Sequence, residues 1–504
     1  MNKKVTDSGQ FWLTVDNPNN LSVLTGLIEL PAPIDIQTFR SLVEKRLLHL
    51  NPFLERIVED PDKKNTSYWV LDHQFDIRTH VQMVRLKNSH DITSLHDIMS
   101  DIMSIPLDMT KPLWQFILVE KYLNGCAIIT RMHQCLMDRV DLIRVLMSLS
   151  DDFNVSNTKP RPHLNPYPKN KWTLFTESLV QKTRTCIDFS TKTANILMTS
   201  CLKPLTNPFY LIEKIRIGMG TTTDRCSELG KFLFMNVDSD SVLKKDLGKI
   251  KKFAWSRSFS LKEIHFLAKS TNSTVNVIYI STLAGAIKQY LKYRKNPIDY
   301  REIRAITPVD MRMNPGEYSG IMRFGLIPFE LPVHIEDPLL RITEVKRRIQ
   351  DLDLLPDAVS AFSSLTRFGM SIQTFSQKIA IPFSKKSSLL MTNTQGPEKP
   401  LFINNIPVEN IMFWLPRIGD IGLGTTILSY NQNVRLGIVC DSKQMPDPQP
   451  FIDAFEQQLK RLIDLVPKKV SQQAIPSSNV TPEVTQYKKS LAIDNVSSEM
   501  TTLW

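Results

Sequence analysis

The side chains of this sequence that could move a proton stand close together, at His133 and Asp138, with Gln134 between them. They follow an apolar run, Cys126 to Met132, which predicts a buried strand, and they precede an apolar-striped helix, Val140 to Leu149. Imidazole titrates near neutral pH and can accept a proton from a hydroxyl group, whereas a glutamine amide cannot. Polar side chains at the end of a buried strand therefore indicate a candidate site.

The spacing leaves two roles open for His133. If residues 126 to 134 are extended, His133 and Gln134 point to opposite faces, because side chains alternate along a strand. A bulge, or the start of the turn, would change the direction of one of them. His133 is then either a general base or a structural histidine held by hydrogen bonds.

The heptapeptide 133–139 resembles the HHxxxDG signature of acyl-CoA-dependent acyltransferases and condensation domains that share the chloramphenicol-acetyltransferase-like fold. In that superfamily the second histidine is the general base, and Gln134 occupies its position here. The resemblance implies that Asp138 is structural and pairs with an arginine, for which Arg312 is the candidate. The alternative for Asp138 is a solvated turn residue next to Arg139.

Motifs in both halves of the chain narrow the resemblance to the wax ester synthase/diacylglycerol acyltransferases, over roughly residues 8 to 465. Among them, Trp114 is implied to pack near the site, and Asn276 either binds substrate or caps a helix. The matching segments are Trp69-Val70-Leu71-Asp72, Phe75-Asp76, His80, Pro112-Leu113-Trp114, Thr274-Val275-Asn276, Pro308-Val309 with Arg312, Asn393 with Gly396-Pro397, Ser429-Tyr430, and Gly437 with Asp441 and Pro446-Asp447-Pro448.

The resemblance implies a function and a fold. The function is transfer of a fatty acyl group from acyl-CoA to a long-chain alcohol or diacylglycerol, without a metal ion or a bound cofactor. The fold is α/β, with two chloramphenicol-acetyltransferase-like subdomains that each hold a mixed sheet and enclose a channel. Since Gln134, Arg139 and Val277 all depart from the family pattern, the alternative is a catalytically silent homologue that binds acyl lipid or a partner protein.

Length and patterning agree with two subdomains. The chain has 504 residues, of which 42% are hydrophobic and 22% charged, as in globular proteins. Strands and helices alternate in both halves, and the longest predicted helix runs from Val275 to Tyr293. We expect an N-terminal subdomain over 1–150, a proline-rich and then basic crossover over 151–230, a C-terminal subdomain over 231–468 and a disordered tail over 469–504.

Charge and cysteine content suggest a cytoplasmic protein with anionic partners. The net charge is +11, and the segment 159–203 holds eight basic residues against two acidic ones. Such a segment is compatible with a peripheral contact with a membrane or lipid-droplet surface, or with a solvated crossover between the two subdomains. It lacks the interleaved aromatic residues that binding of single-stranded nucleic acid would need. The six cysteines form no CxxC pair, and no secretory signal or membrane-spanning segment is evident.

Overall fold

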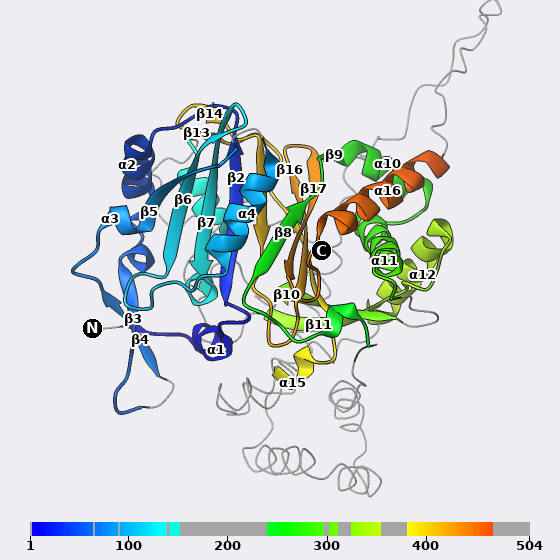
Figure 1. Ribbon diagram of the computed structural model, residues 1–504, viewed down its shortest axis with the longest axis horizontal. Helices are drawn as coiled ribbons and strands as arrows, with labels where there is room; N and C mark the ends of the chain where they lie inside the picture. Colours follow the sequence, from blue (N-terminus) through cyan, green and yellow to red (C-terminus); the bar gives the residue numbers. More distant parts are fainter. Residues whose placement is uncertain are drawn as a thin grey trace, which may run out of the picture.

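The computed structural model describes residues 3–63, 66–88, 91–138, 142–151, 238, 240–296, 302–310, 324–353 and 381–466. Two mixed β-sheets lie side by side at the centre of the molecule, and helices cover their outer faces (Figure 1). The predicted α/β fold with a mixed sheet in each half is confirmed.

The first sheet has the strand order β15-β2-β7-β6-β5. Its central strands β2, β7 and β6 are antiparallel, whereas the edge strand β5 runs parallel to β6. The bounds are β2 (Val23–Leu30), β5 (Val81–Arg85), β6 (Trp114–Tyr122), β7 (Gly125–His133) and β15 (Asn410–Trp414). A separate three-stranded sheet joins β1 (Lys3–Lys4), β4 (Ser67–Leu71) and β3 (Glu55–Glu59).

β7 is the central strand of this sheet, between β2 and β6, and every one of its residues is buried. Helix α2 (Ile36–Leu47) packs on one face, where the ring of Phe39 meets that of Phe116 edge-on at 6.1 Å. The side chain of Asp35 caps this helix by accepting from the backbone N–H groups of Gln37 and Thr38. The remaining helices of this half are α1 (Asp7–Val15), α3 (Ile77–His80), α4 (Ile92–Met103) and α5 (Leu142–Leu149).

The second sheet has the order β11-β10-β12-β16-β17-β8, with β9 paired to β17. β10, β12 and β16 are parallel, and the other neighbours are antiparallel. The bounds are β8 (Lys251–Trp255), β9 (Phe259–Ser260), β10 (Ile303–Asp310), β11 (Phe324–Leu331), β12 (Leu389–Gln395), β16 (Leu423–Tyr430) and β17 (Asn433–Asp441).

A layer of helices covers the outer face of the second sheet: α10 (Leu261–Ser270), α11 (Val275–Tyr293), α12 (Pro338–Asp353) and α16 (Gln449–Leu465) (Figure 1). α11 is buried on nearly all sides, as its apolar sequence requires. Gly285 in this helix is needed because the buried Arg341 crosses it, and an added Cβ would lie 2.4 Å from the guanidinium. The predicted bounds of α11 agree with the structure.

The two halves are joined by β15, which belongs to the C-terminal half but pairs with β2 from Asn410↔Glu29 to Trp414↔Thr25. The hairpin of β13 (Phe402–Ile403) and β14 (Ile406–Pro407), which precedes β15 in the chain, also lies on the first half, where it contacts Asp151. One strand of the first sheet therefore comes from the range 231–468. Of the predicted crossover, 151–230, the structure describes only Asp151. Residues 231–237 and 239, and the predicted tail 469–504, also lie outside the described residues.

Buried ion pairs connect the strands at the junction. Lys251 Nζ donates to Asp441 Oδ2 at 2.5 Å, and Arg435 Nη1 donates to Glu29 Oε2 at 2.8 Å. Lys251 Nζ also donates to the carbonyl oxygens of Asn19 and Gly248, so its three N–H groups have three acceptors. Burial and the neighbouring Arg417 lower the pKa of Lys251 to about 8, which leaves it protonated at pH 7.

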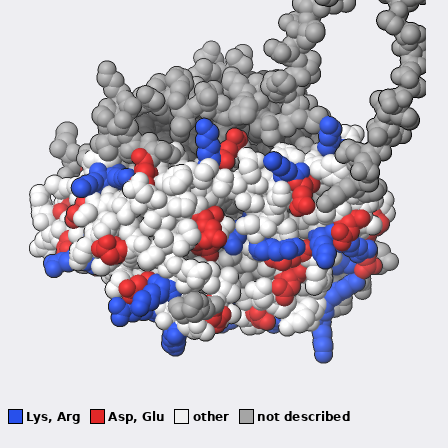
Figure 2. All heavy atoms as spheres, turned by 90° about the horizontal axis from the view of Figure 1, so that it is seen from above, with Lys and Arg blue, Asp and Glu red and all other residues white. Residues whose placement is uncertain are grey.

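None of the helices in the described part of the chain is long and apolar enough to cross a membrane. On the face shown in Figure 2, basic and acidic side chains of the described residues are interspersed.

We predict that Asp441→Ala lowers the free energy of unfolding by ~3–5 kcal/mol, because it leaves the ammonium of Lys251 buried without a counter-ion. Urea denaturation of both proteins measures the loss. The control is Glu120→Ala, which removes the partner of the 74% exposed Arg85 and should cost ~1 kcal/mol or less. Equal losses in the two variants would contradict the assigned role of the buried pair.

His96 gives the junction a dependence on pH. Its ring packs edge-on against Trp255 at 4.2 Å, between α4 and β8, and burial lowers its pKa to about 4. Because an unfolded histidine titrates near ~6.5, the unfolded chain takes up this proton first. We predict that the contribution of His96 to the free energy of unfolding is constant above pH ~6.5. Below that pH the free energy of unfolding should fall, by at most ~1.4 kcal/mol per pH unit, until pH ~4. His96→Gln should flatten this slope, whereas His73→Gln at an exposed position should not.

Candidate functional site

The predicted site lies where β7 ends. His133 is the last residue of the strand and pairs with Val23 of β2, and Gln134 begins the 3-10 helix Gln134–Asp138. The backbone N–H of Gln134 donates to the carbonyl of Ser22 at 2.8 Å, which fixes the turn against the start of β2. The chain therefore leaves the extended conformation between the two residues of interest, as one of the two sequence alternatives allowed.

His133 is 1% exposed, and both of its ring nitrogens face protein groups. The backbone N–H of Cys135 donates to Nδ1 at 3.2 Å, and a carboxylate oxygen of Asp16 lies 3.7 Å from Nε2. Burial acts to lower the pKa of His133, but the Cys135 thiol and the Asp16 carboxylate outweigh it, so the net shift is upward. Nδ1 is occupied by this N–H, and Nε2 is enclosed without a hydrogen bond to a described residue, so neither nitrogen is open to a substrate, which favours the structural role.

Asp16 also holds the chain after α1 in place. Its Oδ1 accepts from the backbone N–H of Ser22 at 2.5 Å, while its Oδ2 faces His133. A single carboxylate thus connects the end of α1, the start of β2 and the end of β7. Sequence reasoning missed this contact, because Asp16 is 117 positions from His133 and lies in an ordinary asparagine-rich turn.

Gln134 is only partly buried, but its side-chain oxygen Oε1 is enclosed and accepts no hydrogen bond from any described residue. An amide oxygen can accept a hydrogen bond from a hydroxyl group and orient it. It cannot take the proton away, since a neutral amide is not a base in the pH range of proteins. This position therefore supports binding of a hydroxyl group better than its activation.

Asp138 closes the same 3-10 helix, but its side chain is outside the described part of the structure. Arg312 and Arg139 also lie outside it. The ion pair between Asp138 and Arg312 remains a prediction.

Trp114 begins β6 and is completely buried. Its Nε1 donates to the carbonyl of Phe53 at 2.9 Å, and its ring stacks on His80 at 4.5 Å. Trp114 therefore acts in packing, on the face of the sheet opposite to His133, since it pairs with Met132 rather than with the histidine.

His80 is a buried polar residue whose environment the sequence did not reveal. Its Nδ1 donates to the carbonyl of Trp114 at 2.8 Å, and its Nε2 has no hydrogen-bond partner among the described residues. Burial lowers the pKa of His80, so the ring is neutral at pH 7. A polar cavity of about 200 Å³ adjoins it, lined also by Thr79, Gln82, Leu107, Asp108, Lys111, Pro112, Trp114 and Gln115.

Asn276 lies in the first turn of α11 and is 3% exposed. Its Oδ1 accepts from Asn393 of β12 at 3.2 Å, which ties the helix to the second sheet. The helix cap is supplied by Thr274, whose hydroxyl accepts from the N–H of Val277. Among the described residues, no hydrogen bond or ion pair joins Asn276 to His133 or Gln134, so the two predicted groups belong to different sheets.

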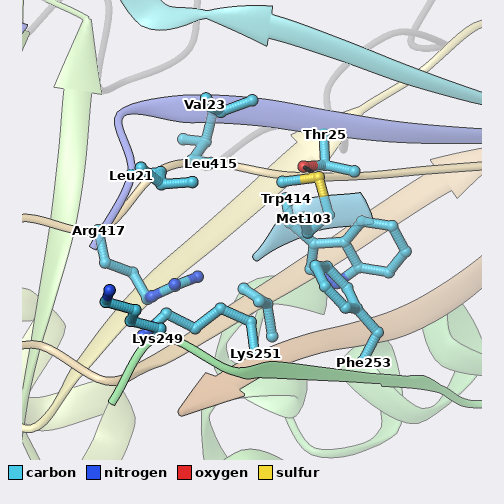
Figure 3. Close-up of a pocket in the computed structure, with 11 residues that line it drawn as sticks. Leu21, Val23, Thr25, Met103, Lys249, Lys251, Phe253, Trp414, Leu415 and Arg417 are labelled. Carbon is cyan, nitrogen blue, oxygen red and sulfur yellow. Dashed lines mark hydrogen bonds between the residues drawn. The ribbon is translucent and has the colours of Figure 1, made fainter. Parts of the chain in front are cut away.

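A cavity of about 20 Å³ lies between the two sheets, where the sequence predicted a channel (Figure 3). It starts beside Val23, the residue paired with His133, and it holds about one water molecule. An acyl chain would fit only if the surrounding side chains moved. The lining residues are Leu21, Val23, Thr25, Met103, Lys249, Lys251, Phe253, Trp414, Leu415, Arg417 and Val439.

The walls of this inter-sheet cavity differ in character. Figure 3 shows the guanidinium of Arg417 pointing toward the lysine side chains at 249 and 251, while Thr25, Met103 and Phe253 lie on the other side. Burial lowers the pKa of Arg417 to about 10, so it stays charged at pH 7. The residues described include no group of three or more histidine, cysteine, aspartate or glutamate side chains that could hold a metal ion.

Comparison with known proteins places this geometry in context. Residues 13–279 match the family described as wax ester synthase/diacylglycerol acyltransferase catalytic domain, and residues 323–463 match the WS/DGAT C-terminal domain. An O-acyltransferase WSD from Acinetobacter baylyi is 22% identical over 426 residues, which are 81% of this chain and 85% of that protein. A probable diacylglycerol O-acyltransferase, tgs1 of Mycobacterium tuberculosis, is 22% identical over 479 residues, 92% of this chain and 96% of that protein.

Solved structures show the same fold. The wax ester synthase/diacylglycerol acyltransferase from Marinobacter aquaeolei superposes with a TM-score of 0.63 at 18% identity, covering 92% of this chain and all of that one. The first condensation domain of the calcium-dependent antibiotic synthetase superposes with a TM-score of 0.55 at 11% identity, covering 92% and 96%. At these identities the likeness concerns the fold alone.

Proposed function

Because this chain belongs to the wax ester synthase/diacylglycerol acyltransferase family, we propose that it transfers a fatty acyl group from acyl-CoA to the hydroxyl of a long-chain alcohol or diacylglycerol. In this reaction the hydroxyl oxygen attacks the thioester carbonyl and loses its proton to a base. The bond from the carbonyl carbon to sulfur then breaks, and the CoA thiolate takes up a proton. The observation that carries the proposal is the family match over both halves of the chain.

The described residues supply positioning better than proton transfer. Gln134 offers a free acceptor oxygen for the hydroxyl, neither ring nitrogen of His133 is open to a substrate, and the ammonium of Lys251 is saturated by three acceptors. A general base contributes ~10²–10⁴ in rate. We therefore propose an acyltransferase that is slow for its family, since substrate binding and orientation would remain without an efficient base.

The second candidate is a homologue that binds acyl lipid or a partner protein without catalysis. Gln134, Arg139 and Val277 favour it because all three depart from the family pattern. The two candidates differ in one measurable property, which is turnover by the unaltered protein.

We predict that Gln134→His raises kcat by ~10²–10⁴, because it places an imidazole at the base position. Purified protein is assayed with radiolabelled acyl-CoA and hexadecanol or diacylglycerol. Gln134→Asn is the matched control, because it keeps the amide and should give no gain. His133→Ala, checked for folding by its melting temperature, should leave kcat unchanged if His133 is structural.

The outcomes separate the candidates. Measurable turnover of the unaltered protein excludes the silent homologue, whereas turnover that appears only in Gln134→His/Arg139→Gly supports it. A loss of kcat in folded His133→Ala would make that residue the base. If no substitution at position 134 changes turnover, the assignment of Gln134 to the base position fails.

We further propose that the basic segment between positions 160 and 204, which lies outside the described residues, contacts an anionic lipid surface. Its excess of basic residues is the support. The protein should float with vesicles that contain phosphatidylserine and should not float with pure phosphatidylcholine. Replacing the basic residues of this segment by glutamine should abolish flotation; unchanged flotation would count against the contact.

A further inference from the structure

Arg417 is a buried cation with no counter-ion among the residues that the structure describes. It follows β15 and is 6% exposed. Its side-chain carbons lie on β16 above Gly424, where an added Cβ would come within 3.2 Å of the arginine Cδ. Gly424 thus makes room for the arginine, which is held between the two sheets.

The guanidinium of Arg417 makes no hydrogen bond or ion pair in the part of the chain that the structure describes, and its Nε is enclosed without a partner. The carboxylate of Asp441, which acts on Arg417 electrostatically, is already occupied. Its Oδ2 accepts from Lys251 Nζ and from the N–H of Gly248, and its Oδ1 accepts from the N–H of Lys443. Asp441 is therefore paired with Lys251, and no hydrogen bond or ion pair joins it to Arg417.

The charges around the inter-sheet cavity are unbalanced. Its described lining includes Lys249, Lys251 and Arg417 and no acidic side chain, and the nearby carboxylate of Asp441 is bound to Lys251. A buried charge without a partner destabilises a fold, and replacing it by an apolar residue commonly costs nothing. An unpaired guanidinium at this place points to an anion that is supplied from outside the chain.

We propose that Arg417, with Lys249 at the exposed rim, binds an oxyanion group of a ligand that enters between the two sheets. A guanidinium binds phosphate and carboxylate oxygens with two parallel N–H donors, which Lys251 cannot do because its donors are used. The far wall of the cavity, with Met103, Phe253 and Trp414, is uncharged, so the ligand carries its charge at the rim and has an uncharged remainder.

The identity of this ligand rests on the proposed function. An acyl donor has phosphate groups on its CoA part, and a free fatty acid has a carboxylate at the end of an apolar chain. Both present the same oxyanion chemistry to Arg417. The cavity, at about 20 Å³, holds about one water molecule, so binding of the ligand requires the neighbouring side chains to move.

Isothermal titration of the full chain with CoA, decanoate and inorganic phosphate tests the site without requiring turnover. We expect Arg417→Met to raise the Kd of the ligand that binds by tenfold or more, and Arg417→Lys to raise it less. Lys249→Met should have a smaller effect in the same direction. Lys245→Met, an exposed lysine that does not line the cavity, removes the same charge and should leave the Kd unchanged.

The ligand-free protein supplies a second measurement. Arg417→Met should melt at the same temperature as the unaltered protein or up to ~2–4 °C higher, because an unpaired buried charge is removed. The increase in melting temperature caused by saturating ligand should disappear in this variant. An unchanged or higher melting temperature together with a lost ligand effect is expected if Arg417 serves binding. If Arg417 serves the fold instead, its replacement would lower the melting temperature.

The results distinguish the sources of the anion and the two proposals. Arg417-dependent binding of CoA assigns a CoA phosphate, and Arg417-dependent binding of decanoate assigns a carboxylate. If CoA binding depends on Arg417 but the protein gives no turnover, the proposed anion site stands and the proposed acyltransferase activity is rejected. Binding of none of the probes, or binding unchanged in Arg417→Met, overturns the site whether or not the protein turns over acyl-CoA.

Discussion

The region between the two sheets is held by the matching of charges that have been removed from water. Lys251 is matched by Asp441 and by two carbonyl oxygens, and Arg435 is matched by Glu29 across the two halves. Such groups are tolerated in a protein interior when they are paired with an opposite charge. Arg417 differs from these two cations because it has no such partner among the described residues. The proposed anion site therefore rests on this unpaired charge and not on the size of the cavity.

The site shows how positioning and chemistry can be separated in one fold. His133 is enclosed by Asp16 and the backbone of Cys135, and this arrangement fixes the end of β7. Gln134, at the next position, keeps an acceptor oxygen in the turn. Under the proposed function, this turn would present the hydroxyl group of the substrate, and an amide would stand where an imidazole would accept its proton.

Local patterns predicted much of this structure, and contacts distant in sequence account for what they missed. β7 and α11 were predictable because every residue of one, and nearly every residue of the other, is buried, which gives long apolar runs. β15 was missed because Ile411 to Trp414 has a partner strand almost four hundred positions earlier. The environments of His133 and Arg417 could not be predicted from the sequence. Asp16 approaches His133, and Gly424 and Asp441 approach Arg417, only in the folded chain.

The pairing of β15 with β2 has a consequence for how the protein is made. While the ribosome produces the chain, β2 emerges first and waits for its neighbour until residue 414 has left the exit tunnel. Throughout this interval one edge of an apolar sheet is open, a state in which nascent chains associate wrongly with one another. Completion of the first sheet thus depends on the insertion of a late strand, and chaperones that shield open sheet edges should raise the share of the protein that reaches its final form.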